Sequence, residues 1–119
     1  MMRQLLLVAV GGAAGSVLRF LCQRVLNNSL FPYGTLAVNI AGCLLIGILF
    51  GYFQKGSFSS NIYLLLVSGF CGGFTTFSAF TQESIVLLTQ QRWTLFLLYV
   101  LGSVAAGLLA TFAGYKLIH

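Results

Sequence analysis

The sequence contains very few charged residues. Among its 119 residues there are six Lys or Arg and one acid, so charged side chains make up 6% of the chain, against about 25% in ordinary soluble domains. Hydrophobic residues account for 59%, and the mean hydropathy is +0.99. This composition excludes a water-soluble domain, because its surface would be one continuous apolar patch. The chain is therefore predicted to fold in a lipid bilayer.

Other residue types are scarce as well, and each shortage excludes a class of function. The only histidine is His119, and the three cysteines have no Cys-x-x-Cys spacing, so zinc sites and histidine-based catalysis lack their usual residues. No two basic residues are adjacent, which excludes a basic patch for nucleic acid. We therefore expect neither an enzyme nor a nucleic-acid-binding protein.

The chain does contain four long apolar stretches separated by short polar connections. About 20 apolar residues in a helix cross the hydrocarbon layer once, and the stretches cover approximately residues 4–25, 34–54, 62–88 and 93–117. The sequence predicts an all-α membrane protein with four transmembrane helices in one domain, residues 1–119. Small residues four apart allow close helix packing in lipid, and such pairs occur at Gly11/Gly15, Gly47/Gly51 and Gly69/Gly73.

The third stretch is predicted to be broken in its middle. Gly72 and Gly73 are followed closely by Thr75 and Thr76, and adjacent glycines and β-branched threonines lower helix propensity. Unwound backbone inside lipid persists only where protein or a bound ion satisfies its carbonyl groups. Two such breaks that face each other across a dimer axis could hold a small hard cation such as Na⁺. Alternatively, the glycines only allow close packing.

The basic residues give no preference for one orientation in the membrane. With four spans, the side of the N-terminus has three Lys or Arg and the opposite side has two, or three if Arg19 inside the first helix is counted. Such a balance allows insertion in both directions, and opposite insertions allow a two-fold axis in the membrane plane. The sequence therefore predicts an antiparallel, dual-topology homodimer. A chance balance in a chain of fixed orientation is the alternative.

Polar residues inside the predicted spans are candidates for a transport pathway, because such residues are costly in lipid. Apart from one acid they are cationic or neutral, a composition that suits an anion. Arg19 offers a fixed positive charge or, alternatively, extends to the headgroups. Phe77 and Phe80 share one helical face, and the positive edges of their rings can contact a dehydrated anion. The polar candidates are Arg19, Asn39, Thr75, Thr76, Ser78, Thr81, Glu83, Ser84, Tyr99 and Ser103.

Glu83 is the only acidic residue, and it leaves a second function open. In a proton-coupled small multidrug cation exporter, a single buried carboxylate would bind substrate and protons. Such exporters carry their acid in the first helix, which has none here. Glu83 is therefore predicted to accept hydrogen bonds from neighbouring hydroxyls or to relay protons near a pore mouth. A purely structural four-helix membrane protein is the third possibility.

Three motifs resemble the CrcB/Fluc family of fluoride channels. They are the third-span run Gly72–Phe80 (GGFTTFSAF), the segment Gly34–Asn39 (GTLAVN), and the Gly-Gly-x-x-Gly-x-x-x-Arg element Gly11–Arg19. The resemblance covers the whole length, and the third-span motif is the most specific. It implies an antiparallel dimer with two fluoride pores and a central Na⁺ that is bound by the backbone carbonyls of Gly72 and Thr75 from both subunits.

The resemblance also implies a role for each candidate side chain. Phe77 and Phe80 match the family's pore phenylalanines. Asn39 matches its pore-lining amide, and Arg19 matches its essential arginine near the vestibule. Polar positions along or beside the pathway are matched by Thr76, Glu83, Tyr99 and Ser103.

The chemistry of fluoride agrees with passive transport. Fluoride is small, strongly hydrated and a strong hydrogen-bond acceptor, so Asn39 and the threonine hydroxyls can replace part of its water shell. Neutral HF crosses lipid and dissociates in the cytoplasm. An inside-negative potential of about 100 mV is then worth about 2.3 kcal/mol per charge, or a gradient of about 40-fold. We therefore expect a fluoride-selective channel in a bacterial plasma or inner membrane, whose partners are fluoride, lipid and a second copy of the chain.

Overall fold

The chain forms four helical segments of membrane-spanning length and no strands. The computed structural model describes residues 1–119, and it confirms the predicted four-helix, all-α architecture. The first two spans are α1 (Met2–Leu26) and α2 (Tyr33–Gln54), and the last is α6 (Trp93–Ile118). The third span, Ser60–Thr89, is composed of several pieces. They are α3 (Ser60–Tyr63), the π-helix η1 (Leu64–Cys71), α4 (Gly72–Phe74) and α5 (Phe77–Thr89).

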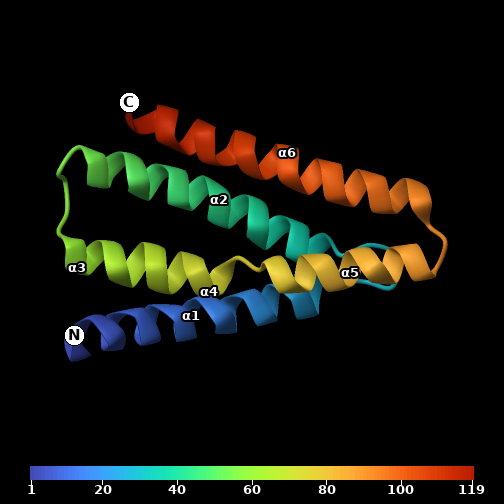
Figure 1. Ribbon diagram of the computed structural model, residues 1–119, viewed down its shortest axis with the longest axis horizontal. Helices are drawn as coiled ribbons and strands as arrows, with labels where there is room; N and C mark the ends of the chain where they lie inside the picture. The colour runs from blue at the N-terminus through green and yellow to red at the C-terminus, as the bar shows by residue number, and fades with distance from the viewer.

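The four spans lie roughly side by side along a molecule of 47 × 31 × 22 Å. Figure 1 shows α6 and α2 adjacent in one half, with the third span and α1 in the other. Both termini and the connection between α2 and α3 lie at one end, and the other two connections lie at the opposite end. A chain of four spans must alternate in this way, so residues 27–32 and 90–92 share a membrane side.

Glycines on α1 allow it to touch the third span backbone to backbone. A Cβ atom added at Gly11 would lie 2.2 Å from the carbonyl oxygen of Leu65, and one at Gly15 would lie 2.2 Å from that of Phe70. Within lipid, helices associate through close packing rather than through hydrophobicity. The predicted packing role of this glycine pair is therefore confirmed, and it fixes α1 against η1 and α4.

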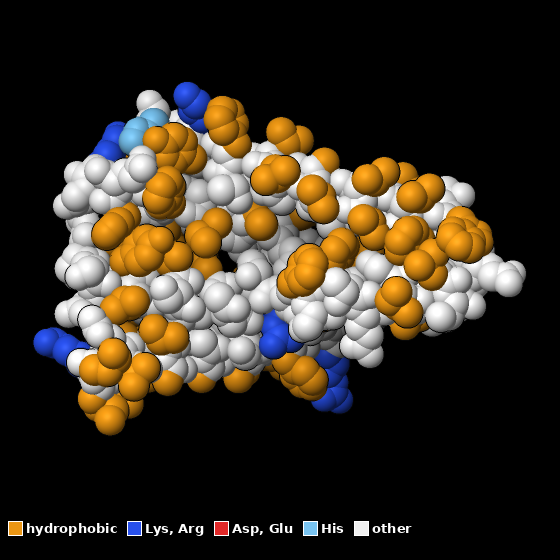
Figure 2. Space-filling view, in the orientation of Figure 1, with side chains coloured by type: hydrophobic (Ala, Val, Ile, Leu, Met, Phe, Trp, Pro, Cys, Tyr) orange, Lys and Arg blue, Asp and Glu red, His pale blue; other side chains and the backbone are white.

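Most of the residues are at least partly exposed. Only 18 of the 119 residues are buried, so the interior of one chain is small and its outer faces must meet lipid or another copy. Figure 2 shows hydrophobic side chains distributed over one whole face, with Lys and Arg near its ends and edges. This distribution is the reverse of that on a soluble protein and fits a multi-pass membrane protein.

The two connections at one end of the bundle are joined by Arg92. Its guanidinium donates hydrogen bonds to the carbonyl oxygens of Ser29, at 3.3 Å, and Leu30, at 2.8 Å. Within the same loop, Asn28 Oδ1 accepts hydrogen bonds from the backbone N–H groups of Leu30 and Phe31 at 2.8 and 2.9 Å. These contacts fix the segment that leads from α1 into α2.

Candidate functional site

The backbone of the third span leaves the helical conformation at two adjacent threonines. Thr75 (φ −83°, ψ 155°) and Thr76 (φ −147°, ψ 121°) are extended and separate α4 from α5. Their hydroxyls satisfy the adjoining helix ends: Thr75 Oγ1 donates to the Cys71 carbonyl at 2.9 Å, and Thr76 Oγ1 accepts from the Ala79 N–H at 3.1 Å. Threonine is suited to both positions because its hydroxyl can cap a helix and its branched Cβ favours extended backbone.

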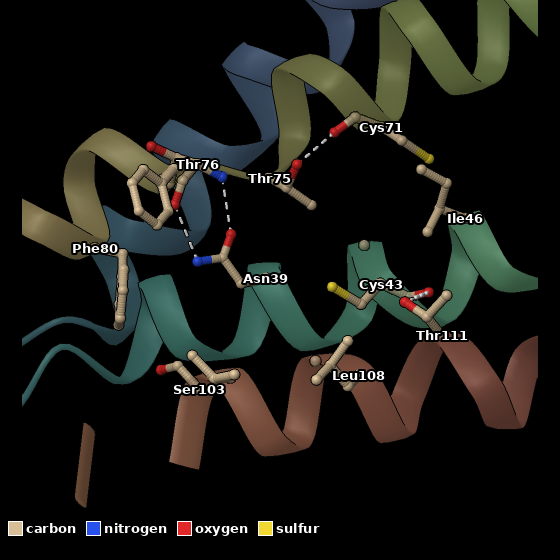
Figure 3. A pocket seen from close by; sticks show the side chains of 14 residues that line it. Asn39, Cys43, Ile46, Cys71, Thr75, Thr76, Phe80, Ser103, Leu108 and Thr111 are labelled. Atoms are coloured by element: carbon tan, nitrogen blue, oxygen red, sulfur yellow. Dashed lines mark hydrogen bonds between the residues drawn. The ribbon is translucent and has the colours of Figure 1, made fainter. Parts of the chain in front are cut away.

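Asn39 on α2 pairs with the extended backbone. Its Nδ2 donates to the Thr76 carbonyl at 3.1 Å, and its Oδ1 accepts from the Thr76 N–H at 2.8 Å. Figure 3 shows this two-point contact spanning the gap between α2 and the third span. The amide thus replaces helical hydrogen bonds that extended residues cannot make, which is what buried backbone in lipid requires.

A cavity of about 410 Å³ lies beside this contact, between α2, the third span and α6. Figure 2 shows this side of the molecule hollowed near its middle, and Figure 3 shows the side chains that border the space. The structure brings six of the predicted residues together in the lining: Asn39, Thr75, Thr76, Phe77, Phe80 and Ser103. The buried hydroxyl of Ser103 has no hydrogen-bond partner within the chain, so its donor is unused in the single chain.

A row of three aromatic rings leads from the cavity toward the N-terminal half of α6. The rings of Phe77 and Phe80 have centroids 5.8 Å apart, and those of Phe80 and Tyr99 are 5.1 Å apart. Phe77 is 76% exposed, whereas Tyr99 is 1% exposed. The row therefore runs from a ring that projects out of the single chain to one enclosed by it.

Glu83 lies beyond these rings and outside the cavity lining. Its carboxylate accepts hydrogen bonds from Tyr99 Oη at 2.9 Å, from Thr35 Oγ1 at 2.9 Å and from Asn27 Nδ2 at 3.1 Å. The prediction that Glu83 accepts hydrogen bonds from neighbouring hydroxyls is confirmed. All three donors are neutral groups, so the carboxyl group is held in place without an ion pair.

Arg19 contacts the third span from α1. Its Nε donates to the Gly73 carbonyl at 3.0 Å, and its Nη1 donates to Gln23 Oε1 at 3.3 Å. The side chain therefore reaches the last turn before the extended threonines. A cation at the C-terminal end of a helical segment is electrostatically favourable, and here it also satisfies a carbonyl of α4.

The structure connects the predicted polar residues through three residues that the sequence did not single out, namely Gln23, Asn27 and Thr35. Gln23 Nε2 donates to Thr35 Oγ1 at 3.0 Å, which completes a chain of hydrogen bonds from Arg19 to Glu83. Arg19, Gln23 and Asn27 are spaced four residues apart, the spacing of one helical face. This spacing could have indicated the hydrogen-bonded chain in the sequence. It did not stand out, because polar residues are common near the end of any helix. Arg19, Gly72, Glu83 and Tyr99 do not line the cavity.

Fold and site together define a small multi-pass membrane protein with a largely apolar cavity between its helices, into which a few polar side chains project. The family model described as "CrcB-like protein, Camphor Resistance (CrcB)" matches residues 6–115. The chain belongs to this family.

Its relatives carry the name of one kind of channel. The chain is 46% identical over 117 residues to a protein of Flavobacterium psychrophilum named "Fluoride-specific ion channel FluC", covering 95% of this chain and 94% of the relative. It is 43% identical to the protein of that name from Phocaeicola vulgatus, covering 95% and 96%. It is 46% identical to "Fluoride-specific ion channel FluC 2" of Rhodococcus jostii, covering 94% and 96%.

Proposed function

We propose that this chain is a fluoride-selective channel through which fluoride leaves the cytoplasm down its electrochemical gradient. The observation that carries the proposal is the set of side chains that line the cavity. It offers the Ser103 hydroxyl and polar groups of Asn39 and Thr76 beside the rings of Phe77 and Phe80, and it has no acidic side chain. Hydrogen-bond donors and ring edges can replace part of the water shell of a small anion. The names of the relatives support fluoride as that anion.

The alternative of a proton-coupled cation exporter finds no support. An exporter needs its carboxylate where the substrate binds, but Glu83 lies outside the cavity lining and is occupied by Asn27, Thr35 and Tyr99. The full-length relatives are named as ion channels, so the chain is not an enzyme. A channel needs no proton coupling, because an inside-negative membrane potential of about 100 mV supplies about 2.3 kcal/mol per charge.

The functional unit in this proposal is an antiparallel, dual-topology homodimer. Phe77 borders the cavity and yet is 76% exposed on the single chain, so a second copy would enclose it. The balanced distribution of Lys and Arg between the two membrane sides supports insertion in both directions. The break at Thr75 and Thr76 would lie at the centre of this dimer.

A structural Na⁺ at the dimer centre belongs to the same proposal. Thr75 has extended ψ, so its carbonyl oxygen cannot accept a helical hydrogen bond and is left for another partner. Gly72 is exposed at the start of α4, where a second copy can approach. Carbonyl oxygens are hard ligands that suit a hard cation. The carbonyls of Gly72 and Thr75 from both copies would hold the ion, and its positive charge would offset the partial negative charges of these oxygens.

The proposed function is tested with purified protein in liposomes loaded with fluoride. When a potassium ionophore removes the charge build-up, fluoride should leave the vesicles and chloride should not. Phe80→Ile should abolish release, because an aliphatic side chain has no positive ring edge. Trp93→Phe at the membrane interface is the matched control and should release fluoride like the original chain. Equal release of both anions, or none by a folded sample, contradicts the proposal.

A further inference from the structure

Asn27 lies just after α1 and uses both sides of its amide in separate contacts. Its Oδ1 accepts hydrogen bonds from the backbone N–H groups of Gly34, at 2.6 Å, and Thr35, at 3.1 Å. Its Nδ2 donates to Glu83 Oε2 at 3.1 Å and to Thr35 Oγ1 at 3.4 Å. One side chain therefore joins the end of α1, the first turn of α2 and the only carboxylate side chain of the protein.

The two sides of the amide do different things. The oxygen caps the free N–H groups at the start of α2, a role that Pro32 at the N-cap position cannot fill because it has no polar side chain. The nitrogen restrains Glu83. A carboxylate at position 27 would keep the cap and lose the restraint, whereas a serine is too short to reach both partners. Asparagine is the residue that does both.

The restraint matters because Glu83 has space to move into. A second cavity, of about 110 Å³, lies under the loop that follows α1 and is lined by both Asn27 and Glu83. A water molecule occupies about 30 Å³ in the liquid, so the space admits water or a displaced side chain. On its other side, Glu83 is bonded to Tyr99, whose ring contacts Phe80 of the larger cavity. A change in the carboxylate position would therefore reach the proposed pathway through Tyr99.

We propose that Asn27 is a positioning residue for fluoride transport: it holds the Glu83 carboxylate in the geometry that keeps Tyr99 and Thr35 in place beside the pathway. The inference rests on the proposed function of the same site. It separates the cap, which stabilises the fold, from the hydrogen bond to Glu83, which serves transport. No residue of α1 itself donates directly to Glu83, because Gln23 reaches it only through Thr35.

Asn27→Asp separates the two roles. It keeps the cap of α2 but removes the donor and places a second carboxylate against Glu83, so like charges repel. We expect only a modest fall in thermal stability in detergent, because the cap is kept, and fluoride efflux at least tenfold slower. Asn28→Asp is the matched control: the same change one residue along, in an exposed loop position whose cap is also preserved. It should leave efflux within twofold.

The double variant Asn27→Asp/Glu83→Gln tests whether Asn27 acts through Glu83. It reverses donor and acceptor in the pair, so the contact is restored and efflux should exceed that of Asn27→Asp. Efflux of Asn27→Asp within twofold of the original chain overturns the inference. A double variant no faster than Asn27→Asp overturns it as well.

Infrared spectroscopy tests the contact without any transport. Glu83 is the only acidic residue, so the spectrum of the original chain minus that of Glu83→Gln isolates its carboxylate stretching band. Asn27→Ser should shift this band because one donor is lost, and Asn28→Ser should not. An unshifted band in Asn27→Ser overturns the inference even if Asn27→Asp fails to fold. If the original chain moves no fluoride but the band shifts, the proposed function fails while the contact stands.

Discussion

The side chain of Asn39 forms two hydrogen bonds with the backbone of Thr76, one to its carbonyl at 3.1 Å and one from its N–H at 2.8 Å. A single amide thereby satisfies both polar groups of a residue that has left the helical conformation. Asn39 and Thr76 also line the cavity. The contact that satisfies the polar groups of the extended backbone in lipid is therefore part of the cavity wall. The structural role of Asn39 and its proposed transport role therefore coincide at this position.

Asn39→Asp should impair both roles. The aspartate keeps the acceptor for the Thr76 N–H but cannot donate to its carbonyl, and it brings a negative charge into the proposed anion pathway. An unsatisfied buried group costs about 1–3 kcal/mol, so we expect a lower unfolding temperature and at least tenfold slower fluoride efflux. Asn28→Asp, which changes an exposed loop residue, is the control. Unchanged stability and efflux in Asn39→Asp would show that the two-point contact is dispensable.

Removal of Na⁺ tests the proposed ion at the dimer centre. Replacement of all Na⁺ by a large organic cation during purification should weaken the dimer, because the carbonyls of Gly72 and Thr75 would face each other without a counter-charge. Subunit exchange between differently labelled samples measures this weakening, and returning Na⁺ should reverse it. Potassium serves as the size control. Exchange rates that are independent of the cation present would count against the site.

The four spans could be predicted closely from the sequence because hydropathy in lipid determines them almost alone. The predicted stretch 34–54 differs from α2 (Tyr33–Gln54) by one residue, and the predicted 93–117 differs from α6 (Trp93–Ile118) by one. The π-helical geometry of η1 (Leu64–Cys71) could not be predicted, because its hydropathy does not distinguish a π-helix from an α-helix.

The candidate site could be predicted as a set of residues but not as two separate places. Asn39, Phe80 and Ser103 were expected in one pathway with Glu83 and Tyr99, and the structure puts the first three in the cavity and the last two beside it. The division depends on which way side chains point from α5 and α6, and sequence spacing does not give that direction. Asn27 was missed because a polar residue after a helix is normally only a cap.

Ser103→Ala should separate transport from stability. The Ser103 hydroxyl is buried without a partner in the chain, so its removal breaks no internal hydrogen bond and should leave the unfolding temperature unchanged. If the hydroxyl binds fluoride during passage, efflux should fall severalfold. Ser84→Ala is the matched control, since the Ser84 hydroxyl already donates to the Phe80 carbonyl at 2.7 Å and lies outside the cavity. Equal efflux from the two variants would remove Ser103 from the pathway.

Arg19→Lys distinguishes the geometry of Arg19 from its charge. Lysine keeps the positive charge, but its single ammonium group cannot reproduce the planar fork between the Gly73 carbonyl and Gln23. We expect fluoride efflux at least tenfold slower, because the end of α4 loses its restraint. Arg24→Lys, at an exposed position in the last turn of α1, should have no effect. If Arg19→Lys transports normally, the residue acts through its charge alone.

Gly15→Ala tests whether close contact between α1 and the third span holds the site together. The added methyl group would lie 2.2 Å from the Phe70 carbonyl oxygen and 2.8 Å from the Phe74 nitrogen, and neither backbone atom can rotate away. Overpacking of this kind costs about 1–3 kcal/mol, so the unfolding temperature should fall. Because α4 must shift, the Arg19 contact to Gly73 should be disturbed and efflux should slow. Gly12→Ala is the control on the same helix, where the methyl group would meet only the Gly69 carbonyl oxygen at 3.7 Å, an ordinary contact distance. Similar losses in both variants would mean that helix flexibility, and not the close approach of the two backbones, is what these glycines provide.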